Sequence, residues 1–336
     1  MAQQPTGGPD ERLISHSTIT QDSLIAGMDI LPKIVVILGP TASGKSGVAL
    51  GLAERVDGEI VSADSGAVFR RLDIGTAKPT PEERERIPHH LIDMIDPDQR
   101  FDAMAYRTAA HAAIGTIIAR GRIPIIAGGT GLYVRALMFG LLDINGSDQT
   151  REVIKRELAG EMTAGLYAAL READPKSADR IKPNDRVRIE RALEIHRMTG
   201  IPASKLQDRH GFRTKQYDAL TFGLLMERRL LYERIDRRTD EMVKKGMVQE
   251  TERILQAGYA PTSPGLMTIG YKEIVAYLLG TIDRDGALSL IKKRTRNYAK
   301  RQMTWFRRVE GIHWIAYPYD IDGMADRARQ FMRGSC

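Results

Sequence analysis

The most constraining feature of the chain is an apolar run, residues 33–38, followed directly by Gly39-Pro40-Thr41-Ala42-Ser43-Gly44-Lys45-Ser46. In this G-x-x-x-x-G-K-S pattern the two glycines let the backbone curl, so that successive N–H groups point at one anion. Lys45 adds a positive charge, and Ser46 places a hydroxyl for Mg²⁺ at the start of the next helix, residues 47–56. The pattern predicts a strand, a phosphate-binding loop and a helix. The alternative is a glycine-rich turn with no ligand.

The phosphate-binding loop leaves the reaction open. Kinases, nucleotide hydrolases and transferases that release diphosphate all use such a loop. The ligand is expected to carry a di- or triphosphate, and the choice among these classes depends on the rest of the chain.

Short apolar runs alternate with longer helical patterns along the chain. The runs cover residues 33–38, 59–63, 90–95, 123–127 and 220–225, and residues 312–317 add a late strand. Strands that alternate with helices are typical of a parallel sheet covered on both faces. We therefore expect a three-layer α/β core.

The strand pattern stops between residues 142 and 217, where the chain becomes helical and charged. Its clearest helix follows Pro183, with Asn184 or Asp185 as N-cap, and ends at Gly200. We expect a helical insertion, residues 142–217, within a core formed by residues 31–141 and 218–318. Residues 1–30 are predicted to be a disordered extension and residues 319–336 a C-terminal tail.

Charge and cysteine usage restrict the partners and the compartment. The 336 residues include 50 Lys plus Arg against 43 Asp plus Glu, a net charge of +7, which favours a polyanionic partner. The single cysteine, Cys336, excludes a disulfide framework and a thiolate-rich metal site. Without an apolar stretch of roughly 20 residues or a signal-like start, the chain is expected to be cytoplasmic with no membrane contact.

Asp64 is the first candidate catalytic residue, because it directly follows the second predicted strand. Ligands of open parallel sheets collect at the carboxyl ends of the strands, so Asp64 is expected to face the phosphate loop. There its carboxylate could hold Mg²⁺ or accept a proton from a nucleophile. The alternative is a helix N-cap.

Gly128-Gly129-Thr130-Gly131 forms a second glycine-rich turn, after the fourth predicted strand. Its backbone amides and the Thr130 hydroxyl would contact the same anion as the phosphate-binding loop, from the neighbouring strand end. The alternative is a tight turn that needs glycines for positive φ.

Two further segments carry cations near the predicted site. Lys78 lies in the polar stretch of residues 72–79, which reads equally well as an active-site loop or a solvated surface loop. Arg234 and Arg238 lie four residues apart on one helix face, where guanidinium groups could offset charge on a leaving group. A surface helix with Arg–Asp pairs is the alternative.

The last long helix is strongly basic. Aromatic residues Tyr298, Trp305 and Phe306 are interleaved with its cations, which is typical of an RNA-contacting surface. The alternative is a solvated face whose aromatic residues turn to the core. The cations are Lys292, Lys293, Arg294, Arg296, Lys300, Arg301, Arg307 and Arg308.

Taken together, these segments resemble the tRNA dimethylallyltransferase family, also called the IPP transferase family. The ordered matches, from about residue 33 to 315, are the phosphate loop, Ala63-Asp64-Ser65, Asp73-Ile74-Gly75-Thr76-Ala77-Lys78-Pro79, Ala127-Gly128-Gly129-Thr130-Gly131-Leu132-Tyr133, Asn184-Asp185 with Arg188 and Arg191-Ala192-Leu193-Glu194, Gly270-Tyr271, and Lys300-Arg301-Gln302-Met303-Thr304-Trp305-Phe306-Arg307. The resemblance implies a P-loop NTPase-like core with a helical insertion domain. It also implies transfer of a dimethylallyl group from dimethylallyl diphosphate to the N6 amine of the adenosine 3′ of a tRNA anticodon.

The resemblance also implies roles for individual residues. Asp64 would be the general base, while Thr130 and Arg238 would hold the diphosphate together with the phosphate loop, and Ser46 would bind Mg²⁺. The tRNA anticodon stem-loop would be contacted by Ser65, Gly66, Ala67, Val68, Phe69, Arg186, Val187, Arg188, Ile189, Glu190, Arg191 and Lys272. The enzyme is expected to be a monomer.

The chain departs from the family pattern at two places. Residues 66–69 stand where a bulkier run ending in Tyr is usual, and Lys272-Glu273 stands where Arg-Gln is usual. Both concern tRNA contacts rather than the reaction, since Lys keeps the charge of Arg but loses its bidentate geometry.

Three other functions fit parts of the pattern. An adenylate dimethylallyltransferase would use the same donor on a free nucleotide, although a small acceptor needs neither the insertion nor the basic helix. A small-molecule kinase would use ATP on the phosphate loop. A non-catalytic RNA-binding protein is disfavoured by the intact Lys45, Ser46 and Asp64.

Overall fold

The computed structural model describes residues 31–142, 144, 147–212 and 214–334. The predicted extension, residues 1–30, and Cys336 lie outside the described residues. Among the helices of the described part, none is long and apolar enough to cross a membrane.

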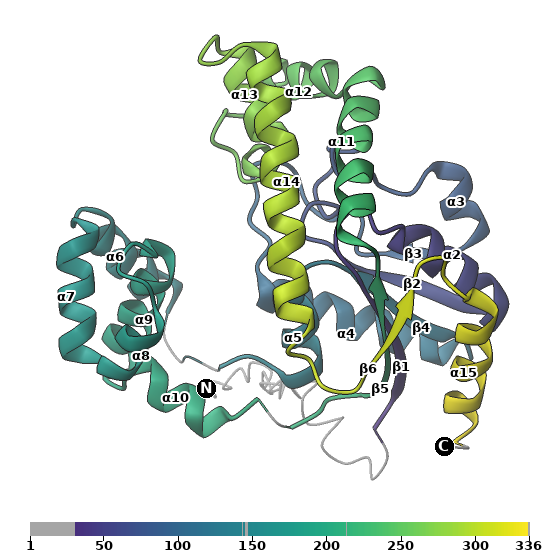
Figure 1. Cartoon of the computed structure of the whole chain (residues 1–336). Coiled ribbons are helices and arrows are strands. Elements are labelled where there is room, and N and C mark those ends of the chain that lie inside the picture. The colour runs from purple at the N-terminus through teal and green to yellow at the C-terminus, as the bar shows by residue number, and fades with distance from the viewer. Residues whose placement is uncertain (1–30, 143, 145–146, 213, 335–336) are drawn as a thin grey trace, which may run out of the picture.

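A fully parallel sheet forms the centre of the molecule (Figure 1). Within the described residues it has six strands in the order β3-β2-β4-β1-β5-β6. The strands are β1 (Lys33–Leu38), β2 (Gly58–Ala63), β3 (His89–His90), β4 (Ile123–Gly128), β5 (Asp218–Leu225) and β6 (Ile312–Ala316). The predicted parallel α/β sheet, including its late strand, is confirmed.

The alternation of side chains along β1 divides the core into two layers. Ile34, Val36 and Leu38 pack against α4 (Ala103–Ala119) and α5 (Gly131–Phe139) on one face. Val35 and Ile37 pack on the other face against α2 (Lys45–Val56) and α15 (Ile321–Arg333). Both sets are fully buried, as the strand period of two residues requires for a central strand. The three-layer core is confirmed.

Two predicted boundaries are wrong. The strand expected over residues 90–95 consists of β3 alone, because Leu91 and Asp93 adopt positive φ and turn the chain away from the sheet. The expected tail after residue 318 contains α15, whose Met324, Ala325 and Ala328 are buried against the sheet. The apolar stripe of α15 is covered by the sheet, and which surface covers a terminal helix depends on the whole fold.

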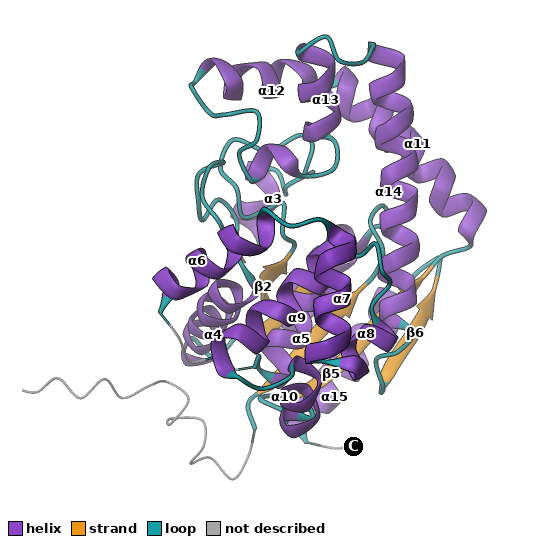
Figure 2. Ribbon diagram, turned by 90° about the vertical axis from the view of Figure 1, so that its left-hand side faces the viewer, coloured by secondary structure: helices purple, strands orange, loops and turns teal. Residues whose placement is uncertain are grey.

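In the described part of the segment predicted as an insertion there are five helices, which stand beside the core as a separate group (Figure 1) and lie in front of the sheet in the turned view (Figure 2). They are α6 (Asp148–Ala159), α7 (Thr163–Ala173), α8 (Pro175–Arg180), α9 (Arg186–Thr199) and α10 (Ala203–His210). The group has its own core, in which Leu158, Leu166 and Leu170 meet Ile189 and Leu193. As predicted, α9 begins after Asp185, which caps the Arg188 N–H, and ends at Gly200 in the left-handed conformation.

A second group of helices rises from the sheet (Figure 1). Its two long helices are α11 (Arg228–Lys244) and α14 (Arg284–Phe306). At their far ends lie α12 (Met247–Gln256), α13 (Tyr271–Leu278) and the short η1 (Gly265–Met267). The remaining helix of the described residues, α3 (Pro81–Arg86), lies on the side of the core. Three of the cations on α14 fasten it to its neighbours. Lys292 pairs with Asp240 at 2.7 Å, Arg296 pairs with Asp236 at 2.6 Å, and Arg294 pairs with Glu273. These three are therefore occupied in holding the fold.

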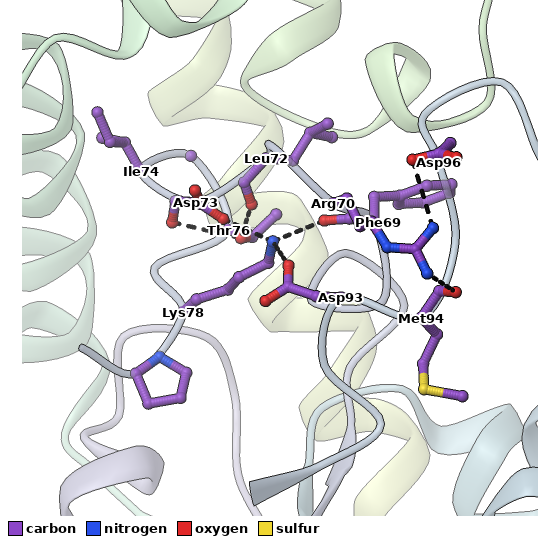
Figure 3. Close-up of polar contacts among 12 residues, drawn as sticks. Phe69, Arg70, Leu72, Asp73, Ile74, Thr76, Lys78, Asp93, Met94 and Asp96 are labelled. Atoms are coloured by element: carbon purple, nitrogen blue, oxygen red, sulfur yellow. Dashed lines mark hydrogen bonds and ion pairs between the residues drawn. The ribbon is translucent and has the colours of Figure 1, made fainter. Parts of the chain in front are cut away.

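The loop of residues 72–79 is tied down by Lys78 (Figure 3). The Lys78 ammonium donates to the Phe69 carbonyl at 2.6 Å and to the carboxylates of Asp73 and Asp93 at 2.7 and 2.5 Å. Its side chain is only 2% exposed. Lys78 is therefore not a solvated surface cation, and that alternative is wrong: its ammonium holds two loop segments together, while the loop residues Thr76, Lys78 and Pro79 border the smaller cavity described below.

Asp93 completes this junction, because it also accepts from Arg84 at 2.8 Å. Burial favours the neutral carboxylic acid, yet the ion pairs with Lys78 and Arg84 outweigh it and lower the pKa of Asp93. A lowered folded-state pKa adds stability above the unfolded pKa and loses it as the pH falls through the folded value.

We predict that Lys78→Met lowers the free energy of unfolding by about 2–3 kcal/mol, because two carboxylates and a carbonyl lose a buried partner. Lys176→Met is the matched control. It removes an exposed pair with Asp208, whose side chains are 60% and 53% exposed, and should cost less than about 0.5 kcal/mol. Urea unfolding at neutral pH measures both.

In the same variant, the free energy of unfolding should fall less steeply as the pH is lowered. The reason is that Asp93, without Lys78, has a folded-state pKa nearer its ordinary value. Activity per folded molecule should stay within a few-fold of wild type. Lost activity at unchanged stability would assign Lys78 to the substrate instead.

Candidate active site

Two adjoining cavities lie at the carboxyl ends of the strands. The larger, about 350 Å³, extends from Thr41 and Asp64 to an apolar wall on the long helices formed by Ile235, Met242, Met247, Met267 and Ile291. The smaller, about 110 Å³, is bordered by Lys45, Ser46 and His89. Both are lined by Thr41, Asp64, Thr76, Arg238 and Tyr298. The site therefore has a polar, phosphate-loop side and an apolar side that meet at Asp64.

The predicted phosphate-binding loop connects β1 to α2 with the expected geometry. Gly44 has φ +91°, a conformation that other residues rarely adopt, and α2 begins immediately after it at Lys45. A Cβ on Gly39 would lie 2.8 Å from the Ser43 Oγ, so that glycine is needed for close approach. The Tyr319 hydroxyl donates to the Ser43 carbonyl at 2.9 Å and braces the loop from outside. The open N-terminus of α2 is a ready anion site.

Lys45, Asp64 and Arg238 form an interacting charge cluster. Burial lowers the pKa of Lys45, opposed by Asp64 and reinforced by Arg238. Burial likewise lowers the pKa of Arg238, and Asp64 again opposes the effect. Two cations thus face one carboxylate, and the surplus positive charge, together with the amides of the loop, suits a bound polyanion.

Asp64 is placed as the sequence predicted, directly after β2 and on both cavities. One carboxylate oxygen, Oδ1, accepts the Gly66 N–H at 2.8 Å. The residues that follow form a turn and not a helix, so the alternative of a helix N-cap is wrong. Asp64 is the acidic residue common to both cavity walls and is available to accept a proton.

Thr130 links the second glycine-rich turn to the end of β2. Its Oγ1 accepts the Ser65 N–H at 3.1 Å and donates to the Ser65 Oγ at 3.3 Å. It also interacts with Tyr298, whose pKa is raised by burial and by Asp64. Thr130 does not border either cavity, so in this structure it positions Ser65 at the edge of the site.

The glycines beside Thr130 are not required for positive φ, and that alternative is wrong. They are required because other parts of the chain approach too closely for a Cβ. A Cβ on Gly128 would lie 2.1 Å from the Ala63 carbonyl oxygen. A Cβ on Gly129 would lie 2.2 Å from the Gln302 Nε2, and one on Gly131 would lie 2.5 Å from the Trp305 ring.

Arg234 and Arg238 both face the phosphate loop from α11. Arg238 borders both cavities, and the Arg234 Nη2 lies 3.4 Å from the position of a Cβ on Gly44. Arg234 also lies over the Tyr317 ring, 5.7 Å from its centroid. Neither arginine forms an ion pair with another described residue, which argues against the surface alternative with Arg–Asp pairs.

Two buried residues that sequence reasoning did not assign hold the loop above the larger cavity. The Tyr271 hydroxyl donates to Glu250 at 2.5 Å and accepts the Gly75 N–H at 3.0 Å. Glu250 also accepts the Asp73 and Ile74 N–H groups, at 3.1 and 3.0 Å. Burial and Glu250 raise the pKa of Tyr271. Tyr271 was noticed only as part of a motif, and Glu250 gave no local signal.

Several residues predicted to contact tRNA have no free side chain. Ala67, Val68 and Phe69 are 7%, 0% and 6% exposed, and Val68 and Phe69 pack in the core below the long helices. Ile189 is fully buried in the insertion. These four side chains are therefore not exposed toward a tRNA, because apolar side chains pack inward wherever a core is available.

The other predicted tRNA-contacting residues divide between structural and exposed positions. Arg186 donates to the carbonyls of Leu158 and Glu161 and pairs with Glu190, so it holds α9 in place. Arg191 pairs with the buried Glu194. The exposed residues of the predicted set are Ser65, Val187, Arg188 and Lys272, while Gly66 is buried against Thr76.

The donor set beside the phosphate loop fits Mg²⁺. Ser46 is exposed at the start of α2 and borders the same cavity as Asp64. Among the described residues no group of three His, Cys, Asp or Glu side chains is arranged to hold a metal on its own. One hydroxyl with a nearby carboxylate suits a Mg²⁺ ion that keeps several waters and is shared with a bound diphosphate.

The chain is similar to known proteins of one family. The family model described as IPP transferase matches residues 67–309. A tRNA dimethylallyltransferase 2 of Geotalea uraniireducens is 48% identical over 303 residues, which cover 89% of this chain and 97% of that protein. A tRNA dimethylallyltransferase of Geobacter sulfurreducens is 47% identical over 300 residues, which cover 89% and 96%.

Solved structures are similar over almost the whole chain. The tRNA isopentenylpyrophosphate transferase of Bacillus halodurans has a TM-score of 0.65 at 38% identity, covering 90% of this chain and 96% of that one. A eukaryotic dimethylallyltransferase described as acting on tRNA has a TM-score of 0.77 at 29% identity, covering 91% and 80%. The chain therefore belongs to the IPP transferase family of tRNA dimethylallyltransferases.

Proposed function

We propose that this enzyme transfers the dimethylallyl group of dimethylallyl diphosphate to the N6 amine of the adenosine immediately 3′ of a tRNA anticodon and releases diphosphate. The observation that carries this proposal is the position of Asp64, between a cationic phosphate loop and a second, apolar cavity. A phosphate loop beside one carboxylate and an apolar space suits a prenyl diphosphate donor and an aromatic acceptor.

The two sides of the site suit the two parts of the donor. The loop amides, Lys45 and Arg238 supply the positive field for a diphosphate. When bound, Mg²⁺ at Ser46 would neutralise further charge on the departing diphosphate. The apolar wall on the long helices, which includes Ile235 and Met242, offers a dry surface for the five-carbon chain and a flat purine.

The reaction divides between one base and two cations. As the amine nitrogen bonds to C1 of the dimethylallyl group, the C1–O bond breaks and its electron pair leaves with the diphosphate. Asp64 accepts the proton that the amine loses, which is needed because an aryl amine is a weak nucleophile. Lys45 and Arg238 stabilise the charge that builds on the leaving oxygen.

The acceptor surface suits an RNA loop larger than a free nucleotide. The insertion exposes Arg188 and α13 exposes Lys272. Further exposed cations are Lys293, Lys300 and Arg301 on α14 and Arg307 and Arg308 directly after it. A base in a stacked loop must be extruded to reach a carboxylate inside a cavity, so contacts on both sides of the site are useful. These surfaces are proposed to grip the anticodon stem-loop. Monomeric state and a cytoplasmic location remain predictions.

We predict that the purified enzyme with Mg²⁺ and radiolabelled dimethylallyl diphosphate labels unmodified tRNA that has adenosine 3′ of the anticodon. AMP should accept little label, because it lacks the contacts of the loop. A tRNA with guanosine at that position is the matched control and should accept none. Labelling of AMP but not tRNA would indicate an adenylate dimethylallyltransferase, and ATP consumption without prenyl transfer a kinase.

We predict that Asp64→Asn lowers kcat by roughly 10²–10⁴-fold, the usual range for loss of a general base, while the Kd for tRNA stays within a few-fold. Asp57→Asn is the control. Asp57 is exposed and has positive φ, which Asn tolerates, so its activity should match wild type. Single-turnover kinetics and a filter-binding assay measure the two quantities. Loss of tRNA binding at an unchanged kcat would remove the general-base role.

A further inference from the structure

Gln302 bridges the two loops that border the phosphate side of the site. It lies on α14 and is 6% exposed. Its Oε1 accepts the Thr41 N–H of the phosphate loop at 2.9 Å. Its Nε2 donates to the Gly129 carbonyl of the second glycine-rich turn, also at 2.9 Å. One side chain thus connects the ends of β1 and β4 from a distant part of the sequence.

The surrounding structure leaves room for this amide and little else. A Cβ on Gly129 would lie 2.2 Å from the Gln302 Nε2. About one turn later on α14, Trp305 fills the space that a Cβ on Gly131 would occupy. The two glycines therefore let α14 pack closely against the turn, and this packing fixes the position of the Gln302 amide.

Only an amide side chain of this length serves both loops at once. The bridge needs an acceptor for an N–H and a donor for a carbonyl. An ionised Glu only accepts, Lys and Arg only donate, and Met does neither. Without Gln302, the Thr41 N–H and the buried Gly129 carbonyl would lose these partners.

The bridge also links the donor loops to the acceptor side. Tyr298, one turn earlier on α14, interacts with the side chains of Thr130 and Gln302 and borders both cavities. Arg301, the residue before Gln302, is exposed and borders the larger cavity. The same face of α14 therefore borders the acceptor side of the site and bridges the two phosphate-facing loops.

We infer that Gln302 is a positioning residue for the donor: its amide sets the distance between the phosphate loop and the Gly129 turn before the diphosphate binds. Preorganised donors cost no rearrangement when charge develops on the leaving group. Because the Thr41 N–H is committed to Gln302, the diphosphate is held by the later amides of the loop and by Lys45. This inference rests on the proposed reaction.

The test is Gln302→Met, a substitution close in size that removes both hydrogen bonds. The KM for dimethylallyl diphosphate should rise about tenfold, while the KM for tRNA stays within about twofold. The Kd for inorganic diphosphate, measured by calorimetry without tRNA, should rise by a similar factor. Gln330→Met is the matched control, since Gln330 is exposed on α15, and it should change none of these values.

Gln302→Asn is the second variant, for use if the Gln302→Met protein does not fold. It keeps the amide but shortens the side chain by one methylene, so it serves at most one loop and should show a smaller, still donor-specific, loss. Gly129→Ala disturbs the bridge from the other side. If it acts through the amide, its effect on the Kd for diphosphate should nearly vanish in a Gln302→Ala background, which frees the space.

Each outcome decides the inference. A lower melting temperature with an unchanged KM for the donor, or a loss confined to tRNA, would overturn it and leave Gln302 a structural or acceptor residue. Additive effects of Gly129→Ala and Gln302→Ala would also overturn it. Failure of the proposed reaction would appear instead in the wild-type enzyme, as an absence of prenyl transfer, while the diphosphate measurement would still report on Gln302.

Discussion

Concentrated positive charge at the end of a parallel sheet is the constraint on which the rest of this structure depends. Lys45 and Arg238 interact with each other and are half-buried, which lowers the pKa of both, and Asp64 is the group that opposes this effect. Such a cluster is stable only when the backbone around it is held firmly and an anion completes it. Much of the surrounding architecture serves to hold that backbone.

The long helices provide this support more than the sheet does. Arg238 reaches the site from α11, and Gln302 joins the two phosphate-facing loops from α14. Ion pairs between α11 and α14 keep the two helices in register. Glu250 and Tyr271 then fix the loop above the larger cavity. The helix α14, whose cations predict an RNA-contacting surface, therefore also supports the loops of the donor site.

The same structure explains how one site accepts two unlike substrates. Polar groups gather on the side of the phosphate loop, and methionines and isoleucines line the wall on the long helices. Asp64 lies where the two environments meet. A carboxylate at that boundary borders both the cationic loop and the apolar side, where an extruded base would be placed. The separate core of the insertion lets that group present Arg188 without disturbing the sheet.

The sequence alone determined the parts of this protein whose chemistry is local. A glycine-rich turn between a strand and a helix, a carboxylate after the second strand and an N-cap at Asp185 each depend on neighbouring residues, and each was predicted correctly. The tertiary structure decided what depends on distant partners. It buried Lys78 between two carboxylates, turned Ala67, Val68 and Phe69 into the interior, and packed α15 where a tail was expected. It also gave Gln302 its two partners, 261 and 173 residues away in the chain. The physical reason is that hydrogen-bond geometry and periodicity act over a few residues, whereas burial is set by whichever surfaces the whole fold brings together.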